Sequence, residues 1–324
     1  MNFIKRTAFA GFVLFACFAT QGHAQSYPSK PIRIVVAGAA GASGDILTRL
    51  VGQKLGDYLG QPVITENRPG AAGLLGAELV AKAAPDGYTL LLNNTTLWAI
   101  MPSVKKSLPY DPSKSFAPVA MLATADNILV VSKNHRAQTL SDLIQYAKTN
   151  PGKLNYGSAG IASPAHLAGE MLGLYANIKM THISYKGAAQ AMVDMIGGSI
   201  DFIVTSPIAA AAQIQNGSVR ILATTGLRRN PSFPHVATMG ETVTGYEMSQ
   251  SWGISAPAGV EKGVIDKLNA ALELSLKQPD VAERIRALGA VPVGGTSEYF
   301  DKYVTAELQR MRDLIHKSGV TLND

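Results

Sequence analysis

The stretch "IRIVVAGAAGASGDILTRL", residues 32–50, combines a strand, a glycine-rich loop and the start of a helix. Its branched apolar beginning favours a buried strand. After the loop, apolar residues recur at helical spacing and predict a helix from about Gly44 to Leu59, with Asp45 in its first turn. A strand that enters a helix in this way begins a βαβ unit, so we expect an α/β fold.

The same alternation continues along the chain. The strand-like segments "PVITEN" (62–67) and "YTLLLNN" (88–94) flank the helical segment "GLLGAELVAKAA" (73–84), which indicates a parallel sheet covered by helices. A second unit of the same kind begins near residue 127, and two long amphipathic segments complete the chain. The proline- and lysine-rich residues 101–119 predict an irregular surface segment.

The first 24 residues predict a secretory signal peptide. Lys5 and Arg6 precede the uncharged run "TAFAGFVLFACFAT", and small residues lead to a cleavage site expected after Ala24. The single cysteine, Cys17, lies in this segment, so lipoprotein anchoring at Cys17 is the alternative. We expect an exported protein and a mature chain with neither a thiol nor a disulfide.

The composition of 47% hydrophobic and 16% charged residues is typical of a folded globular protein. Removal of Lys5 and Arg6 lowers the net charge from +6 to +4, because 29 basic residues become 27 against 23 acidic ones. This mild excess fits an acidic ligand, but it forms no tract, so a nucleic-acid partner is not expected.

The glycine-rich loop has several possible roles. A dinucleotide site requires G-x-G-x-x-G, whereas this loop reads G-x-x-G-x-x-G at Gly38, Gly41 and Gly44, with Ala40 in the place of the middle glycine. Glu66 stands where a ribose-binding acid would, but the glycine spacing argues against that cofactor. A plain tight turn is a second interpretation, and an anion-binding loop is the third.

A second loop of similar character favours the anion-binding role. The segment "GSAGIAS" (157–163) also follows a strand and enters a helix, and helix N-termini with unpaired N–H groups bind anions. Two such loops on facing domains would hold a small anion between them, with hydroxyls from Ser43, Ser158 and Ser163. A third loop, "NNTTLW" (93–98), follows another strand end and adds the candidates Asn94, Thr95 and Thr96.

Asp45 has two interpretations. A carboxylate in the first turn of a helix is favourable for the helix dipole alone. The sharper interpretation is that Asp45 bonds the loop backbone or meets a donor on the ligand.

The sequence contains few signs of catalysis. The six histidines show no metal-ligand spacing, so we expect neither a metal nor a cofactor. Ser158 lacks the G-x-S-x-G context of a nucleophile. His166, in the first turn of the next helix, either packs against the loop or approaches a ligand. We expect no enzyme; a periplasmic hydrolase that uses His166 and Ser158 is the alternative.

Several segments together resemble a known family. The segments "YPSKPIRIVV", "ENRPGAAG", "APDGYTL", "NYGSAGIASPAHLAGEM" and "YKGAAQAMVDMIGGSIDF" resemble the tripartite tricarboxylate transporter substrate-binding receptors, the Bug family, over essentially the whole mature chain. The resemblance implies a two-domain periplasmic binding protein of the type II, Venus-flytrap class, with each domain a mostly parallel sheet flanked by helices and the ligand cleft between them. It supports domain boundaries of 25–124 plus 252–324 and of 125–251, with a hinge near 120–127 and 248–254.

The resemblance also implies the ligand and the partners. The ligand would be a small organic carboxylate, either an aliphatic di- or tricarboxylate, an acidic amino acid or an aromatic acid. A monomeric receptor would deliver it to membrane permease subunits, or, as an alternative, signal to a membrane kinase. The clamp on one carboxylate maps to two loops, and the rest of the ligand is read by more variable positions. The clamp residues are Gly41, Ala42, Ser43, Ser158, Ala159 and Gly160, and the variable ones are Asp45, Thr95, Thr96, Thr205 and Ser206.

The first loop departs from the family pattern. That loop usually carries two prolines and an aromatic residue before the aspartate, but this chain has only alanine and glycine from Ala37 to Ala42. Without the ring, the pocket is expected to be roomier or its loop more flexible.

Overall fold

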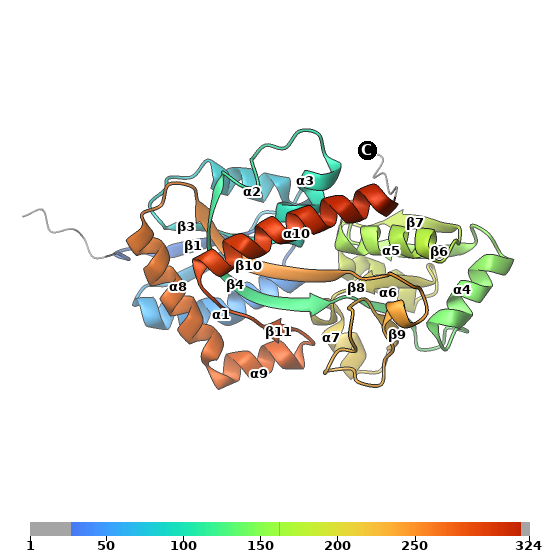
Figure 1. Ribbon diagram of the computed structural model, residues 1–324. Coiled ribbons are helices and arrows are strands. Elements are labelled where there is room, and N and C mark those ends of the chain that lie inside the picture. Colours follow the sequence, from blue (N-terminus) through green and yellow to red (C-terminus); the bar gives the residue numbers. More distant parts are fainter. Residues whose placement is uncertain (1–26, 162, 319–324) are drawn as a thin grey trace, which may run out of the picture.

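The structure is a computed structural model that describes residues 27–161 and 163–318. The expected signal peptide, its cleavage site after Ala24 and Cys17 lie outside the described residues. The described chain forms two lobes side by side, each built around one sheet (Figure 1).

The first sheet has six strands in the order β11-β4-β10-β3-β1-β2. The neighbours β1–β2 and β1–β3 run parallel, whereas β10 runs antiparallel to β3 and β4, and β11 antiparallel to β4. The sheet is therefore mixed, and the expectation of a mostly parallel sheet was wrong for this lobe. The strands are β1 (Ile32–Val36), β2 (Val63–Asn67), β3 (Thr89–Asn94), β4 (Phe116–Asp126), β10 (Ser249–Pro257) and β11 (Val291–Pro292).

The second sheet has five strands in the order β7-β6-β8-β5-β9 and is also mixed. Its pairs β6–β7 and β6–β8 are parallel, while β5 runs antiparallel to both β8 and β9. The cause is the same in both lobes, because the strand that follows each crossing between lobes, β5 or β10, runs against the strands of the βα units. The strands are β5 (Ile128–Ser132), β6 (Leu154–Ser158), β7 (Met180–Ser184), β8 (Phe202–Thr205) and β9 (Val219–Thr224).

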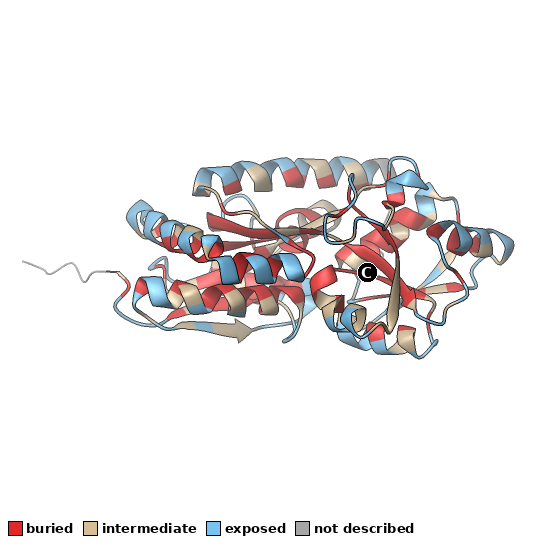
Figure 2. Ribbon diagram, turned by 90° about the horizontal axis from the view of Figure 1, so that it is seen from below, coloured by how far each residue is buried: buried red, intermediate tan, exposed pale blue. Residues whose placement is uncertain are grey.

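Helices cover the faces of both sheets, with their buried sides toward the strands (Figure 2). The helix expected from about Gly44 is α1, which buries Leu47, Val51 and Leu55 on one face and ends at Gly60 in the left-handed conformation. The helices are α1 (Ser43–Leu59), α2 (Leu74–Ala81), α3 (Met101–Val104), α4 (Leu140–Thr149), α5 (Pro164–Tyr175), α6 (Ala188–Ile196), α7 (Pro207–Gln215), α8 (Lys262–Lys277), α9 (Pro279–Ala287) and α10 (Ser297–Ser318).

Three shorter helical segments complete the secondary structure, and one of them changes the expected third loop. A π-helix, η2 (Thr96–Ile100), begins directly after β3 and continues into α3, and η1 (Ala71–Gly73) and η3 (Met239–Glu241) are 3-10 helices. The expectation of an irregular segment over residues 101–119 was wrong at both ends, because α3 begins it and β4 starts at Phe116.

The chain crosses between the sheets at two places that are bonded to each other. The first crossing is Asn127, between β4 and β5, and the second precedes β10. Buried Thr225 joins them: its N–H donates to the Asn127 carbonyl at 2.8 Å, and its carbonyl accepts from the Met248 N–H at 2.8 Å. The two connections therefore run together as one short bridge.

Helix α10 extends along both lobes (Figure 1). The phenyl ring of Phe300 packs against Gly253 of the first sheet. A side chain at position 253 would clash, since its Cβ would lie 2.4 Å from that ring. Met311 and Ile315, further along the helix, join the apolar cluster that contains Leu167 and Tyr156 of the second lobe. One helix thus contributes to the cores of both lobes.

Candidate ligand-binding site

The ends of β1 and β8, which belong to different lobes, meet through two serines. Ser43 begins α1 and Ser206 precedes α7, and their hydroxyl oxygens are 2.5 Å apart although 163 residues separate them in the chain. Both side chains are buried. Two of the predicted site residues, one from each lobe, are therefore in direct contact.

The three helices that begin at predicted site residues differ in how their N-termini are capped. Ser163 accepts the His166 N–H of α5 at 3.2 Å, and Ser206 accepts the Ala209 N–H of α7 at 3.1 Å. At α1 the N-cap is Ala42, which has no side chain able to cap. The first-turn N–H groups of α1 are consequently left for an external acceptor, while those of α5 and α7 are partly satisfied.

Asp45 braces the glycine-rich loop. Its Oδ2 accepts the Gly41 N–H at 2.9 Å, and its Oδ1 accepts Nε of Arg49 at 2.9 Å. Arg49 in turn donates to Asn67 Oδ1 at 3.1 Å, and the Asn67 amide donates to the Gly38 carbonyl at 3.2 Å. The loop is therefore held at both ends by one network that joins it to "ENRPGAAG".

The charge on Asp45 is maintained by that network. Burial alone would raise the pKa of Asp45, but the hydrogen bonds from Arg49 and from the Gly41 amide bring the pKa below its ordinary value. The Gly41 N–H is committed to Asp45, so the candidate donors of this loop for a ligand are the first-turn N–H groups of α1 and the Ser43 hydroxyl.

The second loop follows β6 and is built around Ser158. Its Oγ accepts the Gly160 N–H at 3.2 Å, lies 3.0 Å from the Gly160 carbonyl and is 2.7 Å from Nε2 of His182. Gly160 has a φ of +122°, which side-chain-bearing residues rarely adopt, so the tight turn after Ser158 depends on this glycine. The predicted clamp residues Ser158 to Gly160 form one compact turn before α5.

His166 does not pair with Ser158. Its ring stacks on His182 with centroids 4.0 Å apart, and its Nε2 lies 3.7 Å from Glu170 Oε1. Burial lowers the pKa of His166, against the opposing effect of Glu170. The alternative of a hydrolase that pairs Ser158 with His166 was thus wrong, because the imidazole within hydrogen-bond distance of Ser158 belongs to His182. The sequence had not connected His182, on β7, with the site.

The third predicted loop is largely used for structure. The Thr95 hydroxyl, fully buried, accepts the Ser251 N–H of β10 at 2.9 Å, and the Asn94 side chain accepts the Leu97 N–H at 3.2 Å. Thr96 is buried in the first turn of η2. These bonds tie the end of β3 to the second crossing rather than leaving a free loop.

The junction is closed on the side of α7. Ile208 of α7 is 2% exposed and packs within the apolar cluster of the first lobe. The Asn230 amide donates to the Gly289 carbonyl at 3.4 Å, and the Ser232 hydroxyl to the Arg286 carbonyl at 3.3 Å. Thr205, at the end of β8, is buried beside this contact. The two lobes are therefore in packed contact on this side.

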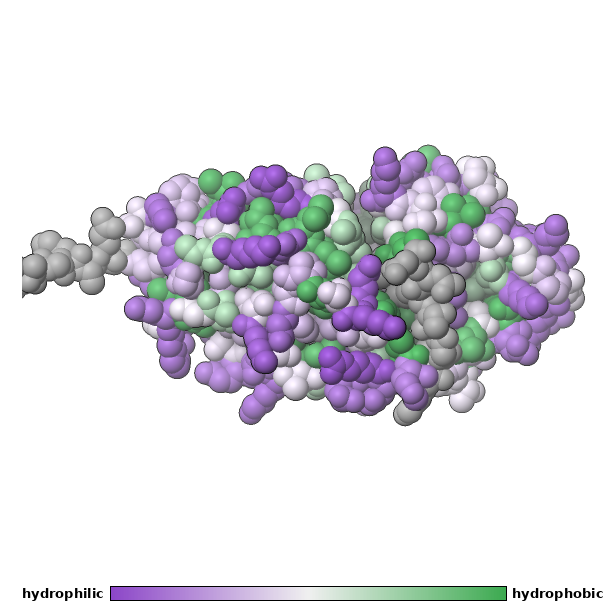
Figure 3. Space-filling model, turned by 90° about the horizontal axis from the view of Figure 1, so that it is seen from above, coloured by the Kyte–Doolittle hydropathy of each residue, from purple (hydrophilic) through white to green (hydrophobic). Residues whose placement is uncertain are grey.

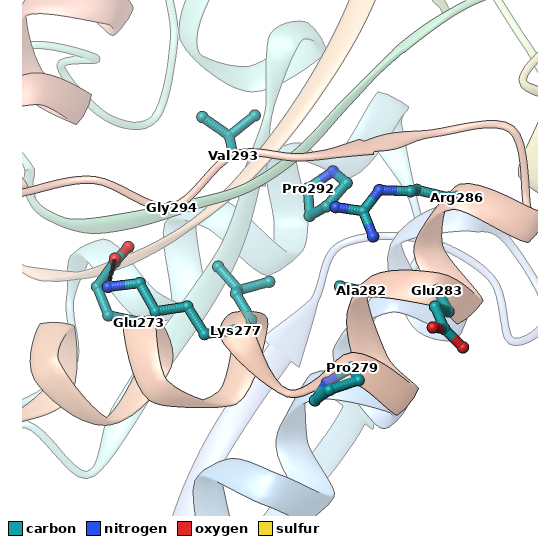
Figure 4. Close-up of a pocket in the computed structure, with 10 residues that line it drawn as sticks. Glu273, Lys277, Pro279, Ala282, Glu283, Arg286, Pro292, Val293 and Gly294 are labelled. Atoms are coloured by element: carbon teal, nitrogen blue, oxygen red, sulfur yellow. Dashed lines mark ion pairs between the residues drawn. The ribbon is translucent and has the colours of Figure 1, made fainter. Parts of the chain in front are cut away.

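A surface pocket of about 440 Å³ lies elsewhere, between α8, α9 and β11 of the first lobe (Figure 4). The Lys277 ammonium is 3.4 Å from Glu273, and the Arg286 guanidinium points toward Pro292 (Figure 4). Acidic and basic groups balance in this pocket, and its residues come from one lobe. It is distinct from the junction of Ser43 and Ser206.

Two further observations concern the part of the chain that the structure describes. Within residues 27–161 and 163–318, no three histidine, cysteine or acidic side chains are grouped to hold a metal ion, and no helix is long and apolar enough to cross a membrane. On the face drawn in Figure 3, strongly hydrophilic side chains are spread over both lobes and separated by small apolar areas.

Comparison with known proteins identifies the family of this chain. The family model of the tripartite tricarboxylate transporter family receptor matches residues 47–320. The chain belongs to this family. It is 32% identical to the protein BugT of Bordetella pertussis over 99% of this chain and 100% of that protein, so the expected Bug family is confirmed.

Solved structures of relatives confirm the fold class. The R. palustris protein Rpa4515, solved with adipate, has a TM-score of 0.87 and 30% identity over 91% of this chain and 99% of its own. MatC from Rhodopseudomonas palustris, solved with bound malate, has a TM-score of 0.83 and 28% identity over 89% and 100%. This receptor is a two-domain periplasmic binding protein in fold, and its family consists of periplasmic substrate-binding receptors rather than enzymes.

Proposed function

We propose that this receptor captures a small organic carboxylate between its two lobes and delivers it to membrane subunits of a tripartite tricarboxylate-type transporter. The observation that carries the proposal is the contact between Ser43 and Ser206, which brings the uncapped N-terminus of α1 against the second lobe. A helix N-terminus carries about half a positive charge and free N–H groups, which suit a carboxylate. The adipate and malate complexes of relatives support the same ligand class.

The domain division is part of the proposal. We assign residues 25–124 and 252–324 to one domain and 125–251 to the other, with a hinge near 120–127 and 248–254. The crossing at Asn127 and the start of β10 at Ser249 support these boundaries. Ligand entry then requires the packed contact around Ile208 to open about the bridge that Thr225 holds, a hinge motion of the usual kind for this fold.

The ligand contacts are assigned to the two loops. One carboxylate lies against the first turn of α1, with the Ser43 hydroxyl, and faces Ser158 and Gly160 of the second lobe. Asp45 acts through the loop backbone, since its oxygens are occupied by Gly41 and Arg49. Among the more variable positions, Thr205 and Ser206 adjoin the contact between lobes, and Thr96 lies at the end of β3.

We further propose that the receptor has no catalytic activity of its own. The Ser158–His182 pair is within hydrogen-bond distance, but burial and the neighbouring His166 lower the pKa of His182 to about 4. An imidazole of that pKa is a weak general base at neutral pH, since catalytic efficiency requires a pKa near the working pH.

A thermal-shift screen tests the ligand class. The panel comprises adipate, malate, citrate, glutamate and benzoate, with the matched neutral diamide of adipate as control. A ligand at a hundredfold excess over its Kd stabilises the folded state by about 2.7 kcal/mol, a readily measured rise in melting temperature. At least one acid should raise the melting temperature while adipamide does not. If no acid acts at millimolar concentration, the proposed function is wrong.

A further inference from the structure

A histidine lies behind the second loop, where no predicted site residue was placed. His182 is on β7, the edge strand of the second sheet, and its Nε2 is 2.7 Å from the Ser158 hydroxyl oxygen. Its ring lies between Tyr156, tilted at a centroid distance of 4.9 Å, and His166, stacked at 4.0 Å. At this distance the imidazole of His182 can determine whether the Ser158 hydroxyl donates or accepts a hydrogen bond.

The parallel register of the sheet explains this placement. Tyr156 pairs with His182 and Ser158 with Ser184, so that alternate residues of β6 and β7 point to the same face. Helix α5 covers that face and supplies His166 and Glu170. The imidazole is therefore fixed from two sides by rings and cannot turn away from Ser158 without repacking.

The hydrogen bonds of Ser158 can be counted. A serine hydroxyl has one proton and accepts two bonds. The Gly160 N–H fills one accepting position. If His182 carries its proton on Nε2, it fills the second. The Ser158 proton then points to the Gly160 carbonyl, which accepts it at 3.0 Å in this structure, and a charged carboxylate is the stronger acceptor that can take its place. If the proton of His182 is on Nδ1 instead, Nε2 accepts the Ser158 proton, and the hydroxyl has no donor left.

A carboxylate can only accept hydrogen bonds, so Ser158 can bind it only when His182 is in the Nε2–H tautomer and not when it is in the Nδ1–H tautomer. We propose that His182 is a positioning residue that donates from Nε2 to Ser158 and thereby turns the Ser158 hydroxyl into a donor for the ligand carboxylate. This inference rests on the proposed function, because it assumes that a carboxylate lies at Ser158.

The surroundings keep His182 neutral, which the proposed arrangement requires. Burial, reinforced by His166, lowers the pKa of His182 to about 4, so above that pH it has a single N–H to place. The other titratable groups on this face are Tyr156, whose hydroxyl donates to Glu170 at 2.5 Å, and His166, whose Nε2 lies 3.7 Å from Glu170. The Glu170 carboxylate is thus engaged by the Tyr156 hydroxyl on β6 and lies beside His166 on α5.

Two substitutions separate hydrogen bonding from packing. His182→Phe keeps a ring between Tyr156 and His166 but cannot donate, whereas His182→Gln keeps a donor but loses the ring. The probe is adipate or malate, whichever the unaltered receptor binds more tightly, measured by calorimetry at pH 7. We expect about a tenfold loss of affinity for His182→Phe, the effect of one hydrogen bond, and a loss of threefold or less for His182→Gln. The exposed His235→Gln is the control and should bind as the unaltered protein does.

The double variant with Ser158→Ala adds a coupling test. If His182 acts through Ser158, His182→Phe should cost nothing further once Ser158 is alanine. The inference is overturned if His182→Phe binds normally, if His182→Gln is the weaker of the two, or if the effects of Ser158→Ala and His182→Phe simply add.

Nitrogen-15 NMR of the unaltered protein gives an answer that does not depend on any variant folding. In the complex with the probe, the shifts of the His182 ring should report the Nε2–H tautomer; an Nδ1–H tautomer overturns the inference. If the unaltered receptor binds none of the five acids, the proposed function fails and the inference with it. If it binds one and the His182 results go the wrong way, the inference fails alone.

Discussion

Replacement of Asp45 by alanine is expected to lower the free energy of unfolding by about 2 to 4 kcal/mol. The buried carboxylate accepts the Gly41 N–H, and a hydrogen bond to a charged group is worth about 1.5–3 kcal/mol. Its pair with Arg49 adds no more than about 1 kcal/mol, because the Arg49 side chain is 55% exposed. Its place in the first turn of α1 adds about 0.3–1 kcal/mol. These contributions share one carboxylate, so the total lies below their upper sum.

Asp45→Asn refines this prediction, because an amide oxygen still accepts from Gly41 while the charge is lost. We expect it to cost about half as much as the alanine variant. Asp57→Asn, on the same helix but exposed, is the matched control and should change the unfolding free energy by less than about 0.5 kcal/mol. Urea unfolding followed by circular dichroism measures all three variants.

The pH dependence gives a sharper check on Asp45. Its pKa in the folded protein is below its unfolded value of about 4, so its contribution is complete above that value and is lost as the pH falls through the folded pKa. The difference between the unaltered protein and Asp45→Asn should therefore shrink in strong acid. A cost for Asp45→Ala no larger than that of Asp57→Asn, or a difference between the unaltered protein and Asp45→Asn that does not shrink as the pH falls below about 4, would refute this reasoning.

Three other predictions concern the contact between lobes and His182. Ser43→Ala removes the bond to Ser206 without uncapping a helix, so the unliganded receptor should open more often, and its radius of gyration in X-ray scattering should increase. Ile208→Ala should cost about 2–4 kcal/mol and also open the lobes, whereas Ile214→Ala, on the same helix but packed against the second sheet, should destabilise without opening. The pKa of His182 is lowered to about 4 from an unfolded value near 6.5, so stability should fall as the pH drops through that interval, and less so in His182→Gln; equal slopes in acid unfolding curves would contradict this.

The sequence predicted those features that depend on local pattern. The helix expected from Gly44 begins at Ser43 and ends at Leu59 as expected, because its apolar face and its terminal glycine are both local signals. Ser163 and Ser206 cap α5 and α7, and a serine directly before a proline at the start of a helix is likewise a local signal. Both sheets were found, but their mixed direction was not, since the reversed direction of β5 and β10 is decided by how the chain crosses between lobes.

The sequence could not predict which side chains meet across strands. His182 was missed because its place depends on the register of β7 against β6, and His166 was paired with Ser158 because it was near in sequence. The helical start at Thr96 was hidden by the polar run "NNTT", whose side chains bond to backbone at Leu97 and Ser251. In each case the deciding contact joins residues distant in the chain or depends on a precise backbone turn.

The position of α10 determines where movement of this receptor can best be observed. The helix is shared by the cores of both lobes, while on the other side Gly289, just after α9, lies against Pro207 of α7 and Asn230 (Figure 1). When the lobes open, their separation should therefore be small near α10 and largest on the side of α7 and α9. Because Cys17 is the only cysteine, a pair of introduced thiols at exposed Gln215 and Glu283 could be labelled selectively with fluorescent dyes in a variant that lacks residues 1–24. Their energy transfer would make the receptor an optical reporter of its own ligand.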